Sequence, residues 1–169
     1  MTNRERMKKY VLSNVVPMLL GNGFTGMYPH YRKIDGNCIE LITFQTNKWG
    51  GSFTVEVSAI FPHAKDSNCA HDTIEAEKVT VWDTNNRYRL KGMYDGWFHY
   101  NDLYAKRIFG FVKDYLAVSE KQKEDFAVPT GYKLVQEFNE ETAINICNEV
   151  NIQLKEAYKW LEKVKMAHK

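Results

Sequence analysis

The chain has 169 residues, the usual size of one globular domain, and 44% of them are hydrophobic. This content excludes an intrinsically disordered protein, since the chain carries enough apolar surface to offset the entropy lost on folding. The net charge of +2, from 23 basic and 21 acidic residues, is too balanced to indicate nucleic acid or anionic lipid as a partner. We therefore expect a single domain over residues 1–169.

The cysteines and the N-terminus indicate the compartment. Cys38, Cys69 and Cys147 are an odd number without short spacing, which predicts reduced thiols in a cytoplasmic protein. The N-terminal basic residues and the apolar run at 10–20 loosely resemble a signal peptide. However, Pro17 interrupts the run, which is also too short to span a bilayer, and no cleavage pattern follows. We expect a cytoplasmic protein that does not associate with membranes.

The first predicted element is a helix over residues 3–20. Its apolar residues recur at three- and four-residue steps, which is the spacing of one helical face: Met7, Val11, Val15, Met18 and Leu19. Pro17 lacks an amide donor and crowds the preceding turn, so we expect a kink or a break near Asn14.

A three-stranded antiparallel meander follows, with strands predicted over residues 28–34, 37–46 and 52–61. Asp35-Gly36 suits a tight turn between the first two strands, and residues 47–51 link the second to the third. The third strand alternates apolar with polar residues, which predicts one face packed on a core and one face exposed to water. The first strand alternates less clearly, which suits a sheet edge.

Residues 62–86 are polar and predict a long excursion, with a short strand possible over 77–83. Two stretches at 87–93 and 97–103 flank Tyr94-Asp95-Gly96, which predicts a second hairpin. That hairpin would extend the sheet to about five strands.

The last third of the chain predicts helices. A second helix is expected over residues 102–118, followed by an exposed loop. A long helix begins after Asn139, a good N-cap, with Phe138 and Ala143 placed as a hydrophobic staple. Its apolar stripe suits packing on the sheet. The same heptad-like spacing would also permit a homodimer through a coiled coil of this C-terminal helix.

Together these elements predict an α+β fold. We expect an antiparallel meander of about five strands, packed on one face by an N-terminal helix and a long C-terminal helix.

A set of short motifs also carries a resemblance to a known family. They are Gly21-x-Gly-Phe24, Tyr31-Arg32, Ile39-x-x-Ile42-x-Phe44-Gln45, Trp49-Gly50, Phe53-Thr54-Val55 and Trp97-Phe98. With the helix that ends at Leu20 and the C-terminal helix, this pattern resembles the bacterial family known as domain of unknown function 4304, over roughly residues 6–100. Residues 103–132 look longer than is usual for the family, which implies an insertion. The resemblance implies a small cytoplasmic bacterial protein without an assigned activity, and some similar proteins look like members of toxin-immunity neighbourhoods.

One loop carries side chains suited to metal binding or catalysis. His63, Cys69 and His71 could together bind zinc, or Cys69 could act as a nucleophile beside a histidine base. Their spacing matches no zinc signature, so a solvated loop is the favoured interpretation. A small metal-dependent or cysteine-based hydrolase that uses the 63–72 loop remains the alternative function. The sequence also contains no nucleophile elbow, phosphate loop or dinucleotide fingerprint, so no cofactor is expected.

Basic and aromatic residues alternate at 30–33 and at 87–91, as they do in some proteins that bind single-stranded nucleic acid. Basic residues on an exposed sheet face or edge explain the same pattern, so nucleic acid is the less favoured partner.

Four residues are candidates for a binding surface. Gln45 could satisfy backbone groups at the end of its strand, or it could present its amide to a ligand in a groove beneath the first helix. Three aromatic residues could line the rim of that groove, although a place in the core is the favoured interpretation: Trp49, Trp97 and Tyr100. With no catalytic set assembled, the sequence favours a non-catalytic module that binds another protein, of the immunity type, with no catalytic residue assigned.

Overall fold

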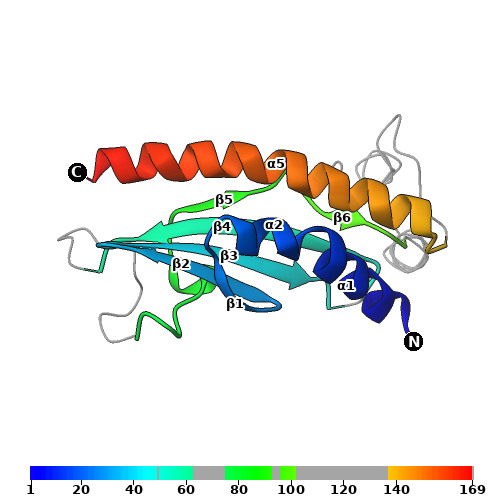
Figure 1. Ribbon diagram of the computed structural model, residues 1–169. Coiled ribbons are helices and arrows are strands. Elements are labelled where there is room, and N and C mark those ends of the chain that lie inside the picture. The colour runs from blue at the N-terminus through cyan, green and yellow to red at the C-terminus, as the bar shows by residue number, and fades with distance from the viewer. Residues whose placement is uncertain (49, 63–74, 93–95, 102–136, 169) are drawn as a thin grey trace, which may run out of the picture.

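The structure is a computed structural model that describes residues 1–48, 50–62, 75–92, 96–101 and 137–168. It shows an α+β fold in which an antiparallel sheet is covered on one face by N-terminal helices and by a long C-terminal helix (Figure 1). The predicted fold class is therefore confirmed. The helix predicted at 102–118, the loop after it and the insertion predicted at 103–132 lie outside the described residues.

The N-terminal helix is broken where the proline predicted a break. Helix α1 spans Asn3–Asn14 and α2 spans Val16–Gly21, with Pro17 in the first turn of α2, where its missing amide costs nothing. Thr2 caps α1: its hydroxyl accepts a hydrogen bond from the Glu5 amide, and the Glu5 carboxylate accepts one from the Thr2 amide.

The sheet has six strands among the described residues, one more than predicted. Their bounds are β1 Thr25–Met27, β2 His30–Asp35, β3 Cys38–Thr46, β4 Ser52–Ile60, β5 Arg87–Arg89 and β6 Phe98–His99. The predicted meander is confirmed as β2, β3 and β4. The extra strand, β1, pairs antiparallel with residues 30–32 of β2 through a turn that contains the cis peptide bond Tyr28–Pro29. The first half of β2 therefore lies inside the sheet, while its second half, residues 33–35, has no strand on this side among the described residues and keeps the edge position that the weak alternation predicted.

The predicted second hairpin is wrong. Strands β5 and β6 do not pair with each other; both pair with β4, at Glu56–Ser58 and at Ser52–Phe53 respectively. They pair with the same edge of β4 at two separate places. Between them, Gly92 and Trp97 lie close together, because a Cβ atom at Gly92 would overlap the backbone of Trp97.

The main core lies between the sheet and the helices. Alternate residues of the strands, among them Tyr31, Phe44 and Val57, point to this side, which we call the helix face. Helix α5, Glu140–Ala167, is capped by Asn139 as predicted and packs its apolar stripe on α1 and on this face. Trp160, which lies off that stripe, contacts the ring of Tyr88 on β5.

The opposite side of the sheet, which we call the far face, is not the solvent-exposed face that the sequence predicted. All nine residues of β4 are buried, including the polar Thr54, Glu56 and Ser58. The reason is that residues 75–84 cross the far face, where Val79 and Val81 form a second, smaller core with Ile39, Leu41 and Ile60 of the sheet. This segment contains a short 3-10 helix, η1 Val81–Asp83, in place of the short strand that was considered for 77–83.

Candidate functional site

Glu56 is the central polar residue of the far face. Its side chain is buried on β4, and Oε1 accepts hydrogen bonds from Nε and Nη2 of Arg89, at 3.0 and 2.7 Å. Arg87, two residues earlier on β5, places Nη1 3.8 Å from Glu56 Oε2. The register explains this arrangement, because Glu56 lies opposite Arg89 and Ser58 lies opposite Arg87. Burial of the carboxylate is thus compensated by two arginines from one edge strand.

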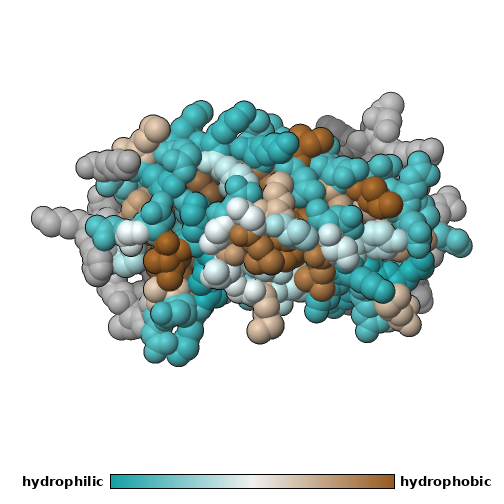
Figure 2. All heavy atoms as spheres, in the orientation of Figure 1, coloured by the Kyte–Doolittle hydropathy of each residue, from teal (hydrophilic) through white to brown (hydrophobic). Residues whose placement is uncertain are grey.

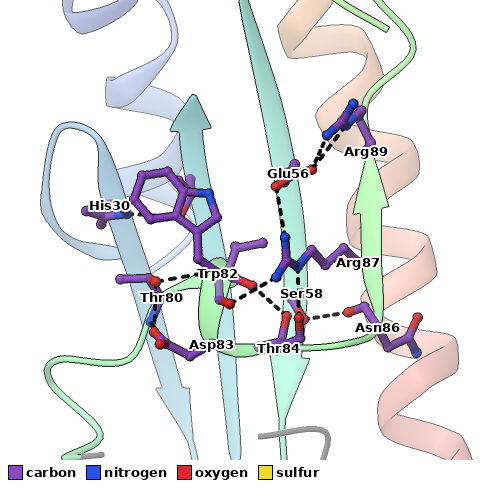
Figure 3. Close-up of polar contacts among 12 residues, drawn as sticks. His30, Glu56, Ser58, Thr80, Trp82, Asp83, Thr84, Asn86, Arg87 and Arg89 are labelled. Carbon is purple, nitrogen blue, oxygen red and sulfur yellow. Dashed lines mark hydrogen bonds and ion pairs between the residues drawn. The ribbon is translucent and has the colours of Figure 1, made fainter. Parts of the chain in front are cut away.

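The same arginine holds the segment that crosses the far face. Arg87 Nε donates to the Thr84 carbonyl at 2.8 Å, and Nη2 donates to the Trp82 carbonyl at 2.9 Å. Asp83 accepts hydrogen bonds from the amide and the hydroxyl of Thr80, which caps η1. Figure 3 shows the result: the Trp82 indole lies over the sheet on the side of His30, and the two arginines converge on Glu56.

His30 and Trp82 connect this cluster to the β2 side of the sheet. The imidazole Nδ1 of His30 lies 3.0 Å from the Thr43 hydroxyl, and its ring meets Trp82 edge-on, with ring centroids 4.9 Å apart. Burial lowers the pKa of His30 below its usual 6.5, and the positive charge of Arg32 lowers it further, while Asp83 opposes the shift. His30 is therefore neutral at pH 7.

Beyond His30, the far face carries an open groove with a volume of about 420 Å³, which we call the edge groove. Its surface is mainly apolar, and residues that line it include Met27, Pro29, His30, Arg32, Ile34 and Glu77. Three large apolar side chains near it are exposed: Met27 by 80%, Ile34 by 55% and Trp82 by 48%. Met27 and Ile34 line the groove, whereas Trp82 lies beside it and contacts His30, which is one of the lining residues.

Figure 2 shows one face of the molecule in the orientation of Figure 1, with α5 along the top and α1, α2 and β1 toward the viewer. The described surface in this view is mainly hydrophilic, with apolar residues in several clusters. Scattered apolar residues are ordinary on protein surfaces, whereas an apolar groove flanked by exposed side chains is typical of a binding site.

The predicted binding residues do not form one groove beneath the first helix. Gln45 is half-buried on the far face, opposite Thr54, and so lies on the other side of the sheet from α1. Tyr100 is buried in the helix-face core, where its ring contacts Phe53 and Phe138. Trp97 is half-buried just before β6. The sheet therefore separates Gln45 from Tyr100.

The remaining candidate residues fall where the structure gives no description. Trp49 and the three residues of the possible metal or hydrolase site, His63, Cys69 and His71, lie outside the described residues. Across the part of the chain that is described, no group of three or more His, Cys, Asp and Glu side chains is arranged to hold a metal ion.

The two other cysteines are unsuited to nucleophilic chemistry. Cys38 and Cys147 are both buried. Burial, and to a lesser extent the negative charge of Glu40, raises the pKa of Cys38 to about 11, and burial raises the pKa of Cys147 to about 12. Both thiols are protonated at neutral pH and pack as small apolar side chains.

The alternating basic and aromatic residues are divided between the two faces. Tyr31 and Tyr88 point to the helix face, where they contact Phe44 and Trp160. Arg32, Arg87 and Arg89 point to the far face. Successive residues of a β-strand point to opposite sides of the sheet. One nucleic-acid strand could therefore not stack its bases on these tyrosines and also place its phosphates on the arginines.

Sequence reasoning missed Met27, Ile34 and Trp82 as surface residues. The sequence places Trp82 in a possible short strand and Ile34 in an edge strand. Arg32 gives a weak signal, because it is one of the alternating basic residues at 30–33. Arg32 becomes part of a site because residues 75–84 cross the sheet beside it, and local sequence patterns do not predict that crossing.

Comparison with known proteins identifies a family to which the residues of this groove belong. No curated protein and no solved structure matches the chain. Residues 15–114 match the family described as "Domain of unknown function (DUF4304)", a stretch that includes all six strands and the edge groove but not α5. Since the match covers more than half of the 169 residues, the chain belongs to the DUF4304 family.

Proposed function

We propose that this protein is a non-catalytic protein-binding module that uses the edge groove and Trp82 as its contact surface. The observation that carries the proposal is the group of exposed apolar side chains, Met27, Ile34 and Trp82, around a groove of about 420 Å³ on one sheet face. Aromatic residues, Met and Arg are enriched in the cores of protein interfaces, and all three types occur here.

The rigidity of this surface supports the proposal. Trp82 stands on a capped turn that Arg87 holds through two backbone carbonyls, and Arg87 in turn faces the buried Glu56. A side chain fixed in this way loses little conformational entropy when a partner covers it, so more of the contact energy appears as affinity.

The family resemblance suggests a partner. An immunity-type protein would bind a toxin encoded beside it in a bacterial genome, so the product of the neighbouring gene is the first candidate. Three cysteines without regular spacing suit a reducing cytoplasm, where such a pair would meet. Fractionation of the source cells tests that location, and recovery of the chain outside the cytoplasm would contradict it.

The test uses two isoleucines with nearly equal exposure. Ile34 in the edge groove is 55% exposed, and Ile152 on α5 is 58% exposed. The full chain is used to isolate a partner from source cells; the partner is then purified and titrated by calorimetry. We expect Ile34→Glu to weaken binding at least about tenfold, or 1.4 kcal/mol, and the control Ile152→Glu to leave it unchanged.

Equal affinities for the wild-type chain and Ile34→Glu would overturn the proposed surface. Circular dichroism of each variant separates loss of binding from loss of folding. Failure to find any partner that distinguishes the two variants would count against the binding function itself.

A further inference from the structure

The edge groove contains a cation, Arg32, that forms no ion pair with any residue that the structure describes. Arg32 lines the groove from β2, its side chain is half-buried, and its Nε is buried without a hydrogen-bond partner. Glu77 also lines the groove, but within the described chain no ion pair joins it to Arg32. A buried donor without an acceptor is costly, and no described residue neutralises the charge of this half-buried side chain, so a ligand in the groove could pair with its guanidinium.

The two other arginines of the far face show the contrast. Arg89 donates two hydrogen bonds to Glu56, and Arg87 donates to two backbone carbonyls and lies beside the same carboxylate. The sheet therefore provides anionic or carbonyl acceptors for the arginines of β5 and none for the Nε of Arg32 on β2. The positive charge of Arg32 also acts on His30, because it contributes to lowering the pKa of that side chain.

We propose that Arg32 binds a carboxylate side chain of the partner protein, an Asp or Glu flanked by apolar residues that fill the edge groove. This inference rests on the proposed binding function and specifies the chemistry of the partner. The flanking residues would lie on Met27 and Ile34, and the carboxylate would accept hydrogen bonds from the guanidinium of Arg32, whose Nε has no acceptor among the described residues.

The charge of the groove favours a carboxylate over a phosphate. A phosphorylated side chain carries about −1.5 to −2 charges at pH 7 and is usually bound by several cations. Arg32 is the single arginine or lysine among the described residues that line the groove, His30 is neutral, and Glu77 adds a negative charge. The guanidinium can pair with one carboxylate, whereas Glu77 would repel the additional negative charge of a phosphate.

The test is a selection of random-sequence peptides displayed on phage against the immobilised full-length chain. We expect enriched peptides to carry an Asp or Glu between apolar residues. Purified peptides should bind Arg32→Gln at least about tenfold more weakly, while Arg4→Gln, which changes an exposed arginine on α1, leaves binding unchanged.

Two further measurements separate binding chemistry from folding. Replacing the peptide's Glu with Gln should weaken binding to the wild-type chain but have little effect with Arg32→Gln, because the two changes remove the same contact. In the wild-type chain labelled with ¹⁵N-arginine, the Arg32 Nε–H resonance should shift when the acidic peptide is added.

Absence of enriched peptides, enrichment without acidic residues, equal affinity for Arg32→Gln, or tighter binding of a phosphoserine analogue would each overturn the inference. These results leave the proposed function standing if the purified partner still distinguishes Ile34→Glu from Ile152→Glu. The two proposals can therefore fail separately.

Discussion

Glu56 carries a buried charge, and the pairing register of β4 and β5 places two arginines next to it. A carboxylate taken out of water costs several kcal/mol unless cations and hydrogen bonds replace the solvent. Arg89 supplies two hydrogen bonds to Oε1, while Oε2 faces Arg87 at 3.8 Å without a hydrogen bond. The carboxylate links β4 to β5, and Arg87 links β5 to the segment that carries Trp82.

We predict that Glu56→Gln lowers the free energy of unfolding by about 2 kcal/mol. Loss of one member of a buried ion pair usually costs about 3 to 5 kcal/mol, and the cost is smaller here because both arginines are partly exposed. Glu75→Gln is the matched control, since Glu75 forms an exposed pair with Lys78 and its loss should cost less than about 0.5 kcal/mol. Urea denaturation measures the free energy of unfolding of each variant. Equal losses would show that the buried Glu56 pair stabilises the fold no more than an exposed pair does.

At the scale of elements, α5 connects two parts of the sheet. Its stripe packs on the helix face, and Gln153 reaches the edge, where its amide accepts from the Lys91 amide and donates to the Lys91 carbonyl. That pair of hydrogen bonds satisfies the backbone just after β5 ends. Near its C-terminus, Lys165 donates to the buried Glu40 of β3 at 2.7 Å. The helix is therefore attached at its middle and at its end.

Two nearby positions on α5 should differ in how much a truncation to alanine lowers the free energy of unfolding. Leu154 is fully buried and Ile152 is exposed. We expect Leu154→Ala to lower the free energy of unfolding by about 3 kcal/mol, because the lost methylene groups leave a cavity, and Ile152→Ala to change it by less than about 0.5 kcal/mol. Chemical denaturation of both variants is the measurement, and a large loss at Ile152 would mean that something covers this face of the helix.

At the scale of the whole molecule, the sheet has a core on each side, and the two differ in size. The larger core needs α5, seven of whose residues are buried: Ala143, Ile146, Cys147, Val150, Leu154, Ala157 and Leu161. The family match at residues 15–114 covers the sheet without this helix. The matched stretch by itself would thus expose the helix face of β3 and β4 to water.

We therefore predict that a chain ending at residue 138 shows no cooperative thermal unfolding. The control ends at residue 167 and lacks the exposed His168 and the residue after it, so it should unfold as the full chain does. Circular dichroism on heating distinguishes the two. A sharp transition in the shorter chain would show that the sheet and the N-terminal helices are stable without α5.

The candidate site was much harder to predict than the fold. Gln45 was placed on the correct strand but assigned to the wrong side of the sheet, since one strand's pattern does not show where a distant helix lies. Tyr100 lies in the core, which is the role that the sequence favours for it over a place on the rim of a groove. Aromatic residues occur in cores and in binding sites, so residue type alone could not separate these roles.

The sequence by itself determined the local elements. Apolar periodicity, the Asn139 cap, the break near Asn14 and the tight turn after β2 predicted helices and a meander that the structure confirms, because these signals depend on contacts within a few residues. Only the tertiary structure decided which segments of the chain pack against each face of the sheet. β4 reads as half exposed, yet all of it is buried, because residues 75–84 fold across it and Arg87 and Arg89 neutralise Glu56. Those contacts join residues about 30 positions apart, and no local pattern specifies them.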